Sequence, residues 1–299
     1  MMSFGRCFMD QNFLRKLIVL SGTIGISFSA VFIRYASVPS LVLVLYRMLI
    51  TAALLAVPVM LKRELRDEIK RADKRVLVFC VLSGIFLTFH FFTYFISVHL
   101  TSVASAVLLT DTEVFFTGLA GFLLFRERIP KGGLIGIAIA FLGCILVTMS
   151  DAGGGSDMLR GDLLALFSAV MMAGYTMLGR VCRQQLSTTV YTLVVYSVTA
   201  VCALLLLLIT GTPVIGYEPV NWLMALGMAV MCTLLGHNIF NWGLKYFRSA
   251  TVSTIKLAEP VFSAILAAAF FREIPTLQAV CGSIVIIFGI WWYLKSSDD

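Results

Sequence analysis

The sequence predicts an all-α polytopic membrane protein whose ten transmembrane helices form two inverted five-helix repeats. Three observations lead to this prediction: an apolar composition, ten apolar stretches long enough to cross a bilayer, and residues that recur at a spacing of about 146. Of the 299 residues, 60% are hydrophobic and 13% are charged, and the mean hydropathy is +0.96. Because a soluble domain carries roughly 25% charged residues, this composition favours the lipid bilayer as the solvent.

The predicted spans account for nearly all of the sequence. A helix needs about 20 mostly apolar residues to cross the hydrocarbon core. The stretches that meet this requirement are approximately 17–37, 40–61, 76–97, 102–125, 133–150, 161–181, 189–210, 221–243, 250–271 and 277–294. The first follows two basic residues as a signal peptide would, but it is long and no small-residue cleavage site follows it. We therefore interpret it as a true span, and no soluble catalytic domain is expected.

Lysine and arginine are distributed unevenly between the two ends of the spans. With the N-terminus placed inside, 18 of the 23 bases lie on the inner side, seven of them between Lys62 and Arg75. Three lie outside, and Arg47 and Lys256 lie within the membrane. Cytoplasmic loops are enriched in Lys and Arg, so both termini are predicted to be cytoplasmic. The net charge of +7 is then a topology signal, and no nucleic acid partner is expected.

No motif indicates an enzyme or a cofactor. The seven cysteines are scattered without a Cys-x-x-Cys pair, so neither a disulfide framework nor a zinc site is predicted. The sequence also lacks Gly-x-Ser-x-Gly and His-Glu-x-x-His, which mark hydrolases and zinc proteases. We expect no enzymatic activity, no metal and no other cofactor.

The repeat is the strongest structural signal. Residues that recur 146 positions apart include Glu113 and Glu259, Glu127 and Glu273, Gly136 and Gly282, and Gly143 and Gly289. The recurring glycines are expected to let helices pack closely. Five spans per half is an odd number, so the second half would enter the membrane from the opposite side, as in many secondary transporters.

The repeat divides the chain into two predicted domains. Residues 1–150 would hold spans one to five, and residues 151–299 would hold spans six to ten. The boundary falls in Asp151–Asp157, a glycine-rich stretch that is typical of a flexible linker.

Five ionisable residues lie inside the predicted spans, namely Arg47, Asp111, Glu113, Lys256 and Glu259. A charge at the centre of a membrane helix costs roughly 2.5–3.5 kcal/mol. Such residues are rarely retained without a function or a partner, so each is a candidate site residue.

Polar residues on spans four and nine recur at i, i+3 and i+7, which places each set on one helix face. The sets are Thr110, Glu113 and Thr117 on span four, and Lys256, Glu259 and Ser263 on span nine. Because the repeat relates the two sets, we expect them to face each other. Proline 260 cannot donate a hydrogen bond to the carbonyl of Lys256, so a free acceptor is expected there.

Several alternatives remain open for these charges. Lys256 and Glu259 either line a site or form a structural pair that seals the helix interface. Glu113 is favoured for a cavity or proton role. Asp111 is two residues away and so points elsewhere, where a structural partner such as Arg47 is at least as plausible as substrate. Arg47 lies near the outer end of span two. A structural role is favoured for it, with the side chain extending to the membrane interface by snorkelling.

Two polar and aromatic clusters complete the candidates. Span eight carries His237, Asn238, Asn241 and Trp242, span three carries His90 and Tyr94, and span six carries Tyr175. Buried amides and imidazoles must find hydrogen-bond partners. Contacts between helices and contacts to a substrate would both satisfy them.

Three motifs carry a resemblance to a known family: EPVF followed by FREIP from Glu259 onward, GHNIFNWGLKY at Gly236–Tyr246, and YRM at Tyr46–Met48. With the ten spans, they resemble the drug/metabolite transporter superfamily and its EamA-type ten-helix branch over nearly the whole chain. The resemblance implies a secondary active carrier of the inner membrane, often an exporter of amino acids, amines or other small metabolites. It also implies a central substrate cavity walled by both halves. Val114 stands where the family pattern has proline, so a kink is expected only in span nine.

These observations favour a carrier that works by alternating access, an exporter that is proton-linked or driven by another gradient. Glu113 and Glu259 would carry the proton or bind a substrate ammonium, while Lys256 or Arg47 would meet a carboxylate. The alternatives are a broad-specificity exporter of drugs or organic cations and, less favoured, a channel or receptor. Substrate identity, coupling ion, direction of transport and the choice between monomer and homodimer stay open.

Overall fold

The structure is a computed structural model that describes residues 11–101, 103–126, 129–149, 158–272 and 277–296. Every regular element in these ranges is a helix. The expected linker at 151–157 and the residues Glu127 and Glu273 lie outside the described ranges.

Eight helical segments are long and apolar enough to cross a membrane. They are Gln11–Tyr35, Ser40–Leu61, Lys74–Leu100, Ala106–Phe125, Met158–Arg183, Thr188–Ile209, Val220–Gly243 and Ser249–Phe271. Each corresponds to one of the ten predicted spans. Two more apolar helices, Lys131–Gly143 and Val280–Ser296, stand at the fifth and tenth places but are shorter over the described residues. Ten membrane crossings and the inverted orientation of the second half therefore stay predictions.

Several spans consist of two helices because a turn interrupts them. In chain order, the helices are α1 (Gln11–Ser27), α2 (Ser29–Tyr35), α3 (Ser40–Leu61), α4 (Arg63–Arg71), α5 (Lys74–Leu100), α6 (Val103–Asp111), α7 (Glu113–Phe125), α8 (Lys131–Met149), α9 (Met158–Arg183), α10 (Thr188–Ile209), α11 (Val220–Gly227), the π-helix η1 (Met228–His237), α12 (Asn238–Gly243), α13 (Ser249–Lys256), α14 (Glu259–Phe271) and α15 (Leu277–Ser296).

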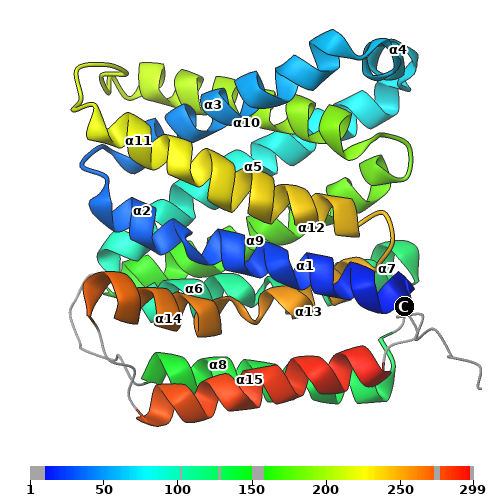
Figure 1. The fold of residues 1–299 in the computed structure, drawn as a ribbon, viewed down its shortest axis with the longest axis vertical. Coiled ribbons are helices and arrows are strands. Elements are labelled where there is room, and N and C mark those ends of the chain that lie inside the picture. The colour runs from blue at the N-terminus through cyan, green and yellow to red at the C-terminus, as the bar shows by residue number, and fades with distance from the viewer. Residues whose placement is uncertain (1–10, 102, 127–128, 150–157, 273–276, 297–299) are drawn as a thin grey trace, which may run out of the picture.

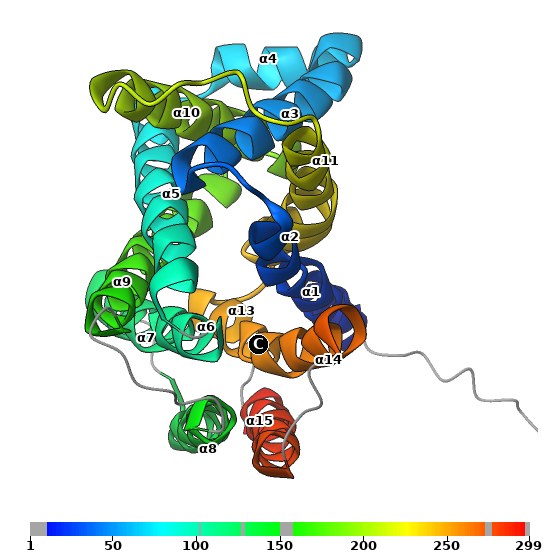
Figure 2. The same ribbon diagram turned by 90° about the vertical axis from the view of Figure 1, so that its left-hand side faces the viewer.

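The helices are stacked along the longest axis of the molecule (Figure 1). Helices α3 and α10 pack together at one end, and α8 and α15 lie side by side at the other. The turned view shows α5 and α9 on one side of the middle and α1, α2 and α11 on the other (Figure 2). The largest buried cluster draws residues from α3, α5, α9 and α10 as well as η1. This arrangement leaves the centre of the molecule between the two sides, where the candidate site lies.

The glycines that recur in the sequence lie at the contact between α8 and α15. A Cβ on Gly136 would stand 2.9 Å from the carbonyl oxygen of Gly289, and a Cβ on Gly143 would stand 2.7 Å from that of Gly282. Real side chains do not approach backbone so closely, so these positions need glycine for close helix packing. The predicted packing role of the glycines is confirmed at this contact. The 146-residue offset exchanges the two contacts, because Gly136 corresponds to Gly282 and Gly143 to Gly289.

Spans four and nine are both interrupted near their middles. Span four has a turn at Thr112 between α6 and α7, and span nine has a turn at Leu257–Ala258 between α13 and α14. The expectation of a kink in span nine alone is therefore wrong. The break in span four needs no proline, because the Thr112 hydroxyl donates a 2.6 Å hydrogen bond to the carbonyl oxygen of Leu109. A threonine hydroxyl that bonds the backbone in this way favours a turn over a continuous helix.

Both spans also end alike. Arg126 has φ 55° and Arg272 has φ 58°, and these two are the non-glycine residues with positive φ among those described. A left-handed residue commonly closes the C-terminus of a helix. The two caps are 146 positions apart, so the sequence spacing has a local structural counterpart.

Candidate functional site

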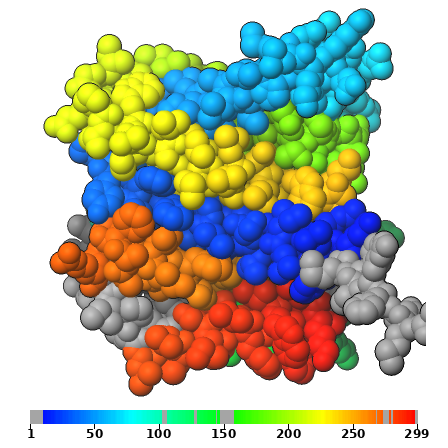
Figure 3. Space-filling model, viewed as in Figure 1, coloured from blue at the N-terminus to red at the C-terminus, as the bar shows by residue number. Residues whose placement is uncertain are grey.

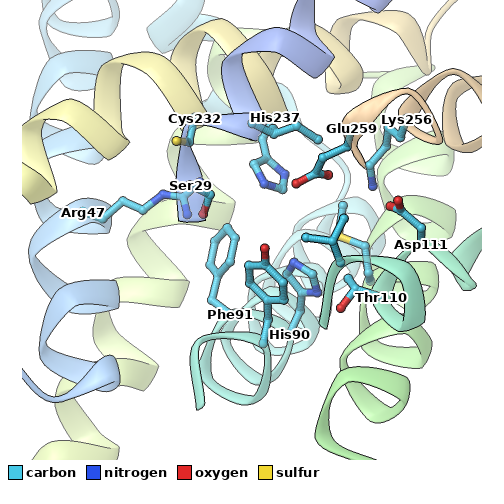
Figure 4. Close-up of a pocket in the computed structure, with 14 residues that line it drawn as sticks. Ser29, Arg47, His90, Phe91, Thr110, Asp111, Cys232, His237, Lys256 and Glu259 are labelled. Atoms are coloured by element: carbon cyan, nitrogen blue, oxygen red, sulfur yellow. The ribbon is translucent and has the colours of Figure 1, made fainter. Parts of the chain in front are cut away.

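A small cavity lies at the centre of the molecule between residues from both halves of the chain (Figure 4). Its volume is about 40 Å³. A water needs roughly 10–15 Å³ by this measure, so the cavity has room for about three waters. Helices α3, α5 and α6 contribute wall residues from the first half of the chain, and η1, α13 and α14 contribute them from the second.

Arg47 projects from α3 into one end of the cavity (Figure 4). It is 1% exposed, its Nε donates a 2.7 Å hydrogen bond to Thr233 Oγ1, and its guanidinium lies 4.2 Å from the centre of the Phe91 ring. Within the described residues, its Nη2 atom has no hydrogen-bond partner. Snorkelling is therefore the wrong expectation for Arg47, because side chains from two other helices hold it inside the protein.

Lys256 is paired with Glu113. Its Nζ donates to Glu113 Oε1 at 2.5 Å, and the two residues are 6% and 1% exposed. Of the two alternatives for Lys256 and Glu259, the structural pair is wrong, because Lys256 bonds Glu113 and the turn after Lys256 breaks the helix on which the i, i+3 spacing was counted. Lys256 lines the cavity, whereas Glu113 lies behind it and is not part of the wall.

Asp111 and Glu259 are the carboxylates that line the cavity. From the sequence, Asp111 is expected to point elsewhere and Glu113 to face the cavity, and the structure reverses the two. The turn at Thr112 is the reason, since residues on either side of it no longer share one helical face. Asp111 Oδ2 has no hydrogen-bond partner in the described part of the chain. Asp111 lies at the opposite end of the cavity from Arg47, the partner considered for it (Figure 4).

Two histidines stand between these ends. His90 and Tyr94 from α5 both line the cavity, with nearly parallel rings whose centres are 6.0 Å apart. His90 Nδ1 is hydrogen-bonded to Ser168 Oγ at 2.8 Å, which orients its ring. His237 lines the opposite wall with its imidazole next to the carboxylate of Glu259 (Figure 4). Its Nδ1 has no partner within the described residues.

The π-helix η1 carries His237 and Cys232 to the cavity and Thr233 to Arg47. Thr233 Oγ1 also donates to the carbonyl oxygen of Met228, five residues earlier, at 3.2 Å. π-Helical segments are rare and occur frequently at functional sites. No residue pattern in this stretch predicts the wider turn, and Cys232 was not among the candidate site residues predicted from the sequence.

The remaining predicted residues lie outside the cavity wall. Asn241 Nδ2 donates to the Tyr175 hydroxyl at 2.6 Å in a buried contact, and Trp242 packs on Tyr246 with ring centres 4.8 Å apart. Asn238 is half-buried and is not among the wall residues. Asn241 and Tyr175 therefore bond helices together in this structure.

Sequence reasoning missed several wall residues. Phe91, Met172 and Ser29 line the cavity without having been singled out. Phe91 and Met172 are apolar and resemble the packing residues around them. Ser29 follows the turn at Phe28 between α1 and α2. This third interrupted span marks the position of Ser29, but the interruption is seen in the structure and was not predicted from the sequence.

Comparison with known proteins identifies the family. A model of the EamA-like transporter family matches residues 16–149 and again residues 159–295. The chain belongs to the EamA-like transporter family. It is thus a multi-pass membrane protein of the drug/metabolite transporter superfamily, and its family is one of transporters.

Several relatives of this EamA-like protein are named as transporters. One from Clostridium kluyveri, an uncharacterized transporter, is 25% identical over 63% of this chain and 62% of its own length. The Bacillus subtilis uncharacterized transporter YxxF is 24% identical over 91% of this chain and 85% of its own. A Salmonella typhimurium protein named "Probable amino-acid metabolite efflux pump" is 25% identical over 62% of this chain and 65% of its own. The chain thus spans less than two thirds of the Clostridium and Salmonella relatives.

A solved crystal structure shares the fold of this EamA-like chain. The two align with a TM-score of 0.78 at 19% identity, covering 94% of this chain and 98% of the other. The cavity draws on both segments that match the family: Arg47, His90 and Asp111 come from the first, and His237, Lys256 and Glu259 come from the second.

Proposed function

We propose that this EamA-like protein is a secondary active transporter that exports a small zwitterionic metabolite, of the amino acid class, through the central cavity. It would reside in the cytoplasmic membrane with both termini in the cytoplasm, as the distribution of Lys and Arg predicts. The two halves would rock against each other to expose the cavity to either side in turn.

One observation carries the proposal: Arg47 lies at one end of the cavity, and the carboxylates of Asp111 and Glu259 lie at the other, beside a lysine, Lys256, that is already paired with Glu113. Arg47 stands at one end with Nη2 unpartnered, and Asp111 stands at the other with Oδ2 unpartnered, both within the described residues. Buried polar atoms are rarely left without partners. The carboxylate of an amino acid would satisfy Arg47, and its ammonium would satisfy Asp111 and Glu259. The name of the Salmonella relative agrees with this substrate class.

The cavity volume indicates what the protein must do to bind such a substrate. Small-molecule pockets generally measure about 300–1,000 Å³, far above the 40 Å³ of this cavity. The walls must therefore move apart for substrate to enter, and the turns in spans four and nine lie beside the charges that would separate. An occluded conformation with a contracted site is an expected state of an alternating-access cycle.

Thermal stability of the purified protein against a ligand panel tests the proposal. The panel holds amino acids, the matching amines that lack the carboxylate, and the matching acids that lack the amine. A ligand at 100 times its Kd stabilises a protein by about 2.7 kcal/mol. We expect amino acids to stabilise the protein more than either set of truncated analogues.

The variant Arg47→Met tests whether Arg47 binds the substrate carboxylate. Hydrogen bonds to charged groups contribute about 1.5–3 kcal/mol, so the Kd for amino acids should rise at least about tenfold while that for the amines changes little. Arg160→Met, at an exposed position on α9, is the matched control and should bind as wild type. An Arg47→Met protein that binds amino acids as tightly as wild type would contradict the proposed substrate class.

The second candidate is an exporter of drugs or organic cations. The ring of Tyr94, which lines the cavity together with Asp111 and Glu259, favours it, because aromatic faces attract organic cations. In that case many unrelated lipophilic cations would stabilise the protein, and Arg47→Met would leave their binding unchanged. Saturable flux and counterflow in vesicles distinguish either carrier from a channel, which shows neither.

A further inference from the structure

A second hollow opens on the surface of the molecule, away from the central cavity. Its volume is about 290 Å³, and it lies between α1, α13 and α15. Figure 3 shows α1 running directly above α15 on the face viewed, with α13 and α14 beside them. Its walls share no residue with those of the central cavity.

Most of the residues that line the groove are apolar. Phe13, Leu17 and Leu20 line it from α1, and Ile290 and Leu294 line it from α15. In a protein that spans the bilayer, an exposed apolar groove of this kind faces the lipid acyl chains.

The groove also carries two positive charges near one end. Lys16 lies close to the start of α1 and Lys295 close to the end of α15, so the two ammonium groups belong to the same end of the helices. Within the described residues neither lysine is in a salt bridge, and no acidic side chain lines the groove. Lys295 Nζ lies 5.2 Å from the centre of the Trp291 ring, a cation–π contact within the groove wall.

We infer that this groove binds an anionic phospholipid, with the headgroup phosphate between Lys16 and Lys295 and an acyl chain along the apolar walls. Basic pockets between transmembrane helices are recognised sites for anionic headgroups. A second copy of the chain is a poorer occupant, because the same face would bring two more ammonium groups to this end. The inference does not depend on the transported substrate.

The site connects the lipid to the transport machinery. Ile255 lines the groove from α13, and the next residue is Lys256, which bonds Glu113 and lines the cavity. A bound acyl chain would therefore support the outer side of α13 where its inner side carries the buried charge pair.

Native mass spectrometry of the full-length protein in mixed micelles tests the inference. Equal amounts of phosphatidylglycerol and phosphatidylcholine with identical acyl chains are offered, and the ratio of the two bound lipids is measured. Each lysine near an anionic headgroup favours binding about fivefold. We expect wild-type protein to prefer phosphatidylglycerol, and Lys16→Gln with Lys295→Gln to bring the ratio close to one.

The ratio is measured within one sample, so a loss of overall stability in the variant does not imitate the result. Lys245→Gln, an exposed lysine outside the groove, is the control and should keep the wild-type ratio. Two outcomes would overturn the inference. One is a double variant that keeps its preference for phosphatidylglycerol. The other is a wild-type protein that binds the two lipids equally and binds only inorganic phosphate at this site.

Discussion

Spans four and nine share a backbone plan but differ in their charges. Both are broken near the middle and both end in a left-handed arginine, at Arg126 and Arg272. At the break, span four carries Asp111 and Glu113, whereas span nine carries Lys256 and Glu259. The offset of 146 pairs Glu113 with Glu259 but pairs Lys256 with Thr110 and Asp111 with Leu257.

A duplicated backbone feature can thus serve two chemical roles. Because only span nine has a lysine, its ammonium crosses to Glu113 and joins the two spans, which leaves Glu259 free to face the cavity. Two carboxylates at equivalent positions therefore have different environments. Glu113 is buried in an ion pair, and Glu259 lines the cavity beside His237.

The largest expected effect comes from breaking the ion pair. Glu113→Gln leaves the ammonium of Lys256 buried without its counter-charge, and breaking a buried pair by removing one partner costs about 3–5 kcal/mol. We expect the free energy of unfolding, measured by denaturant titration in micelles, to fall by this amount. The equivalent variant Glu259→Gln removes no ion pair in the described part of the chain and should cost about 1 kcal/mol or less.

A double variant measures the interaction between Glu113 and Lys256 separately from the effect of replacing either residue. Replacing both partners of a buried pair with uncharged groups is often nearly neutral, so Glu113→Gln with Lys256→Met should recover much of the lost stability. The coupling energy from the double-mutant cycle measures the pair directly. Equal losses from Glu113→Gln and Glu259→Gln would show that the two carboxylates are equivalent after all.

The contrast also shows what sequence alone predicts well. The predicted spans follow from length and composition over about 20 residues, and at eight of them the structure has a helical segment long and apolar enough to cross a membrane. The break in span four was missed because it contains no proline, the residue that marks a helix break in the sequence. Thr112 favours a turn only when its hydroxyl bonds the backbone, as it does to Leu109, and the sequence does not show whether it does. The partner of Lys256 was missed for a related reason, since i, i+3 spacing implies proximity only on an unbroken helix.

The site residues show the same limit. His90, Tyr94 and His237 were singled out because polar side chains within apolar spans are conspicuous, and they do line the cavity. The cavity position of Arg47 depends on Phe91 and Thr233 from two other helices. Such contacts are set by tertiary packing, and no spacing along the chain encodes them.

The next effect concerns transport. If Asp111 and Glu259 bind the substrate ammonium, Asp111→Asn and Glu259→Gln should each raise the KM for amino acid flux about tenfold, because each removes a charged hydrogen-bond acceptor. They should also weaken the pH dependence of flux, since these carboxyls face the cavity. Initial rates in proteoliposomes at several pH values measure both, with Glu218→Gln, at an exposed position, as the control. A larger change in KM from Glu113→Gln than from either cavity variant would return Glu113 to the substrate site.

The smallest effect distinguishes the two ways of breaking a helix. Thr112→Val keeps the shape of the side chain but removes the hydroxyl that bonds Leu109, at a cost of about 1 kcal/mol. Pro260→Ala restores a backbone N–H in span nine. The turn there is also held by hydrogen bonds from Leu257 N to Thr254 O and from Ala258 N to Ile255 O, both at 3.2 Å.

We therefore expect Pro260→Ala to change stability by less than about 1 kcal/mol, because the turn does not depend on the proline alone. If the proline were the sole cause of the break, α13 and α14 would join into one helix in Pro260→Ala. Lys256 would then leave Glu113, and the loss would approach that of Glu113→Gln. The loss of unfolding free energy in Pro260→Ala therefore decides whether tertiary packing or the proline maintains the interruption in span nine. The loss in Thr112→Val answers the same question for Thr112 in span four.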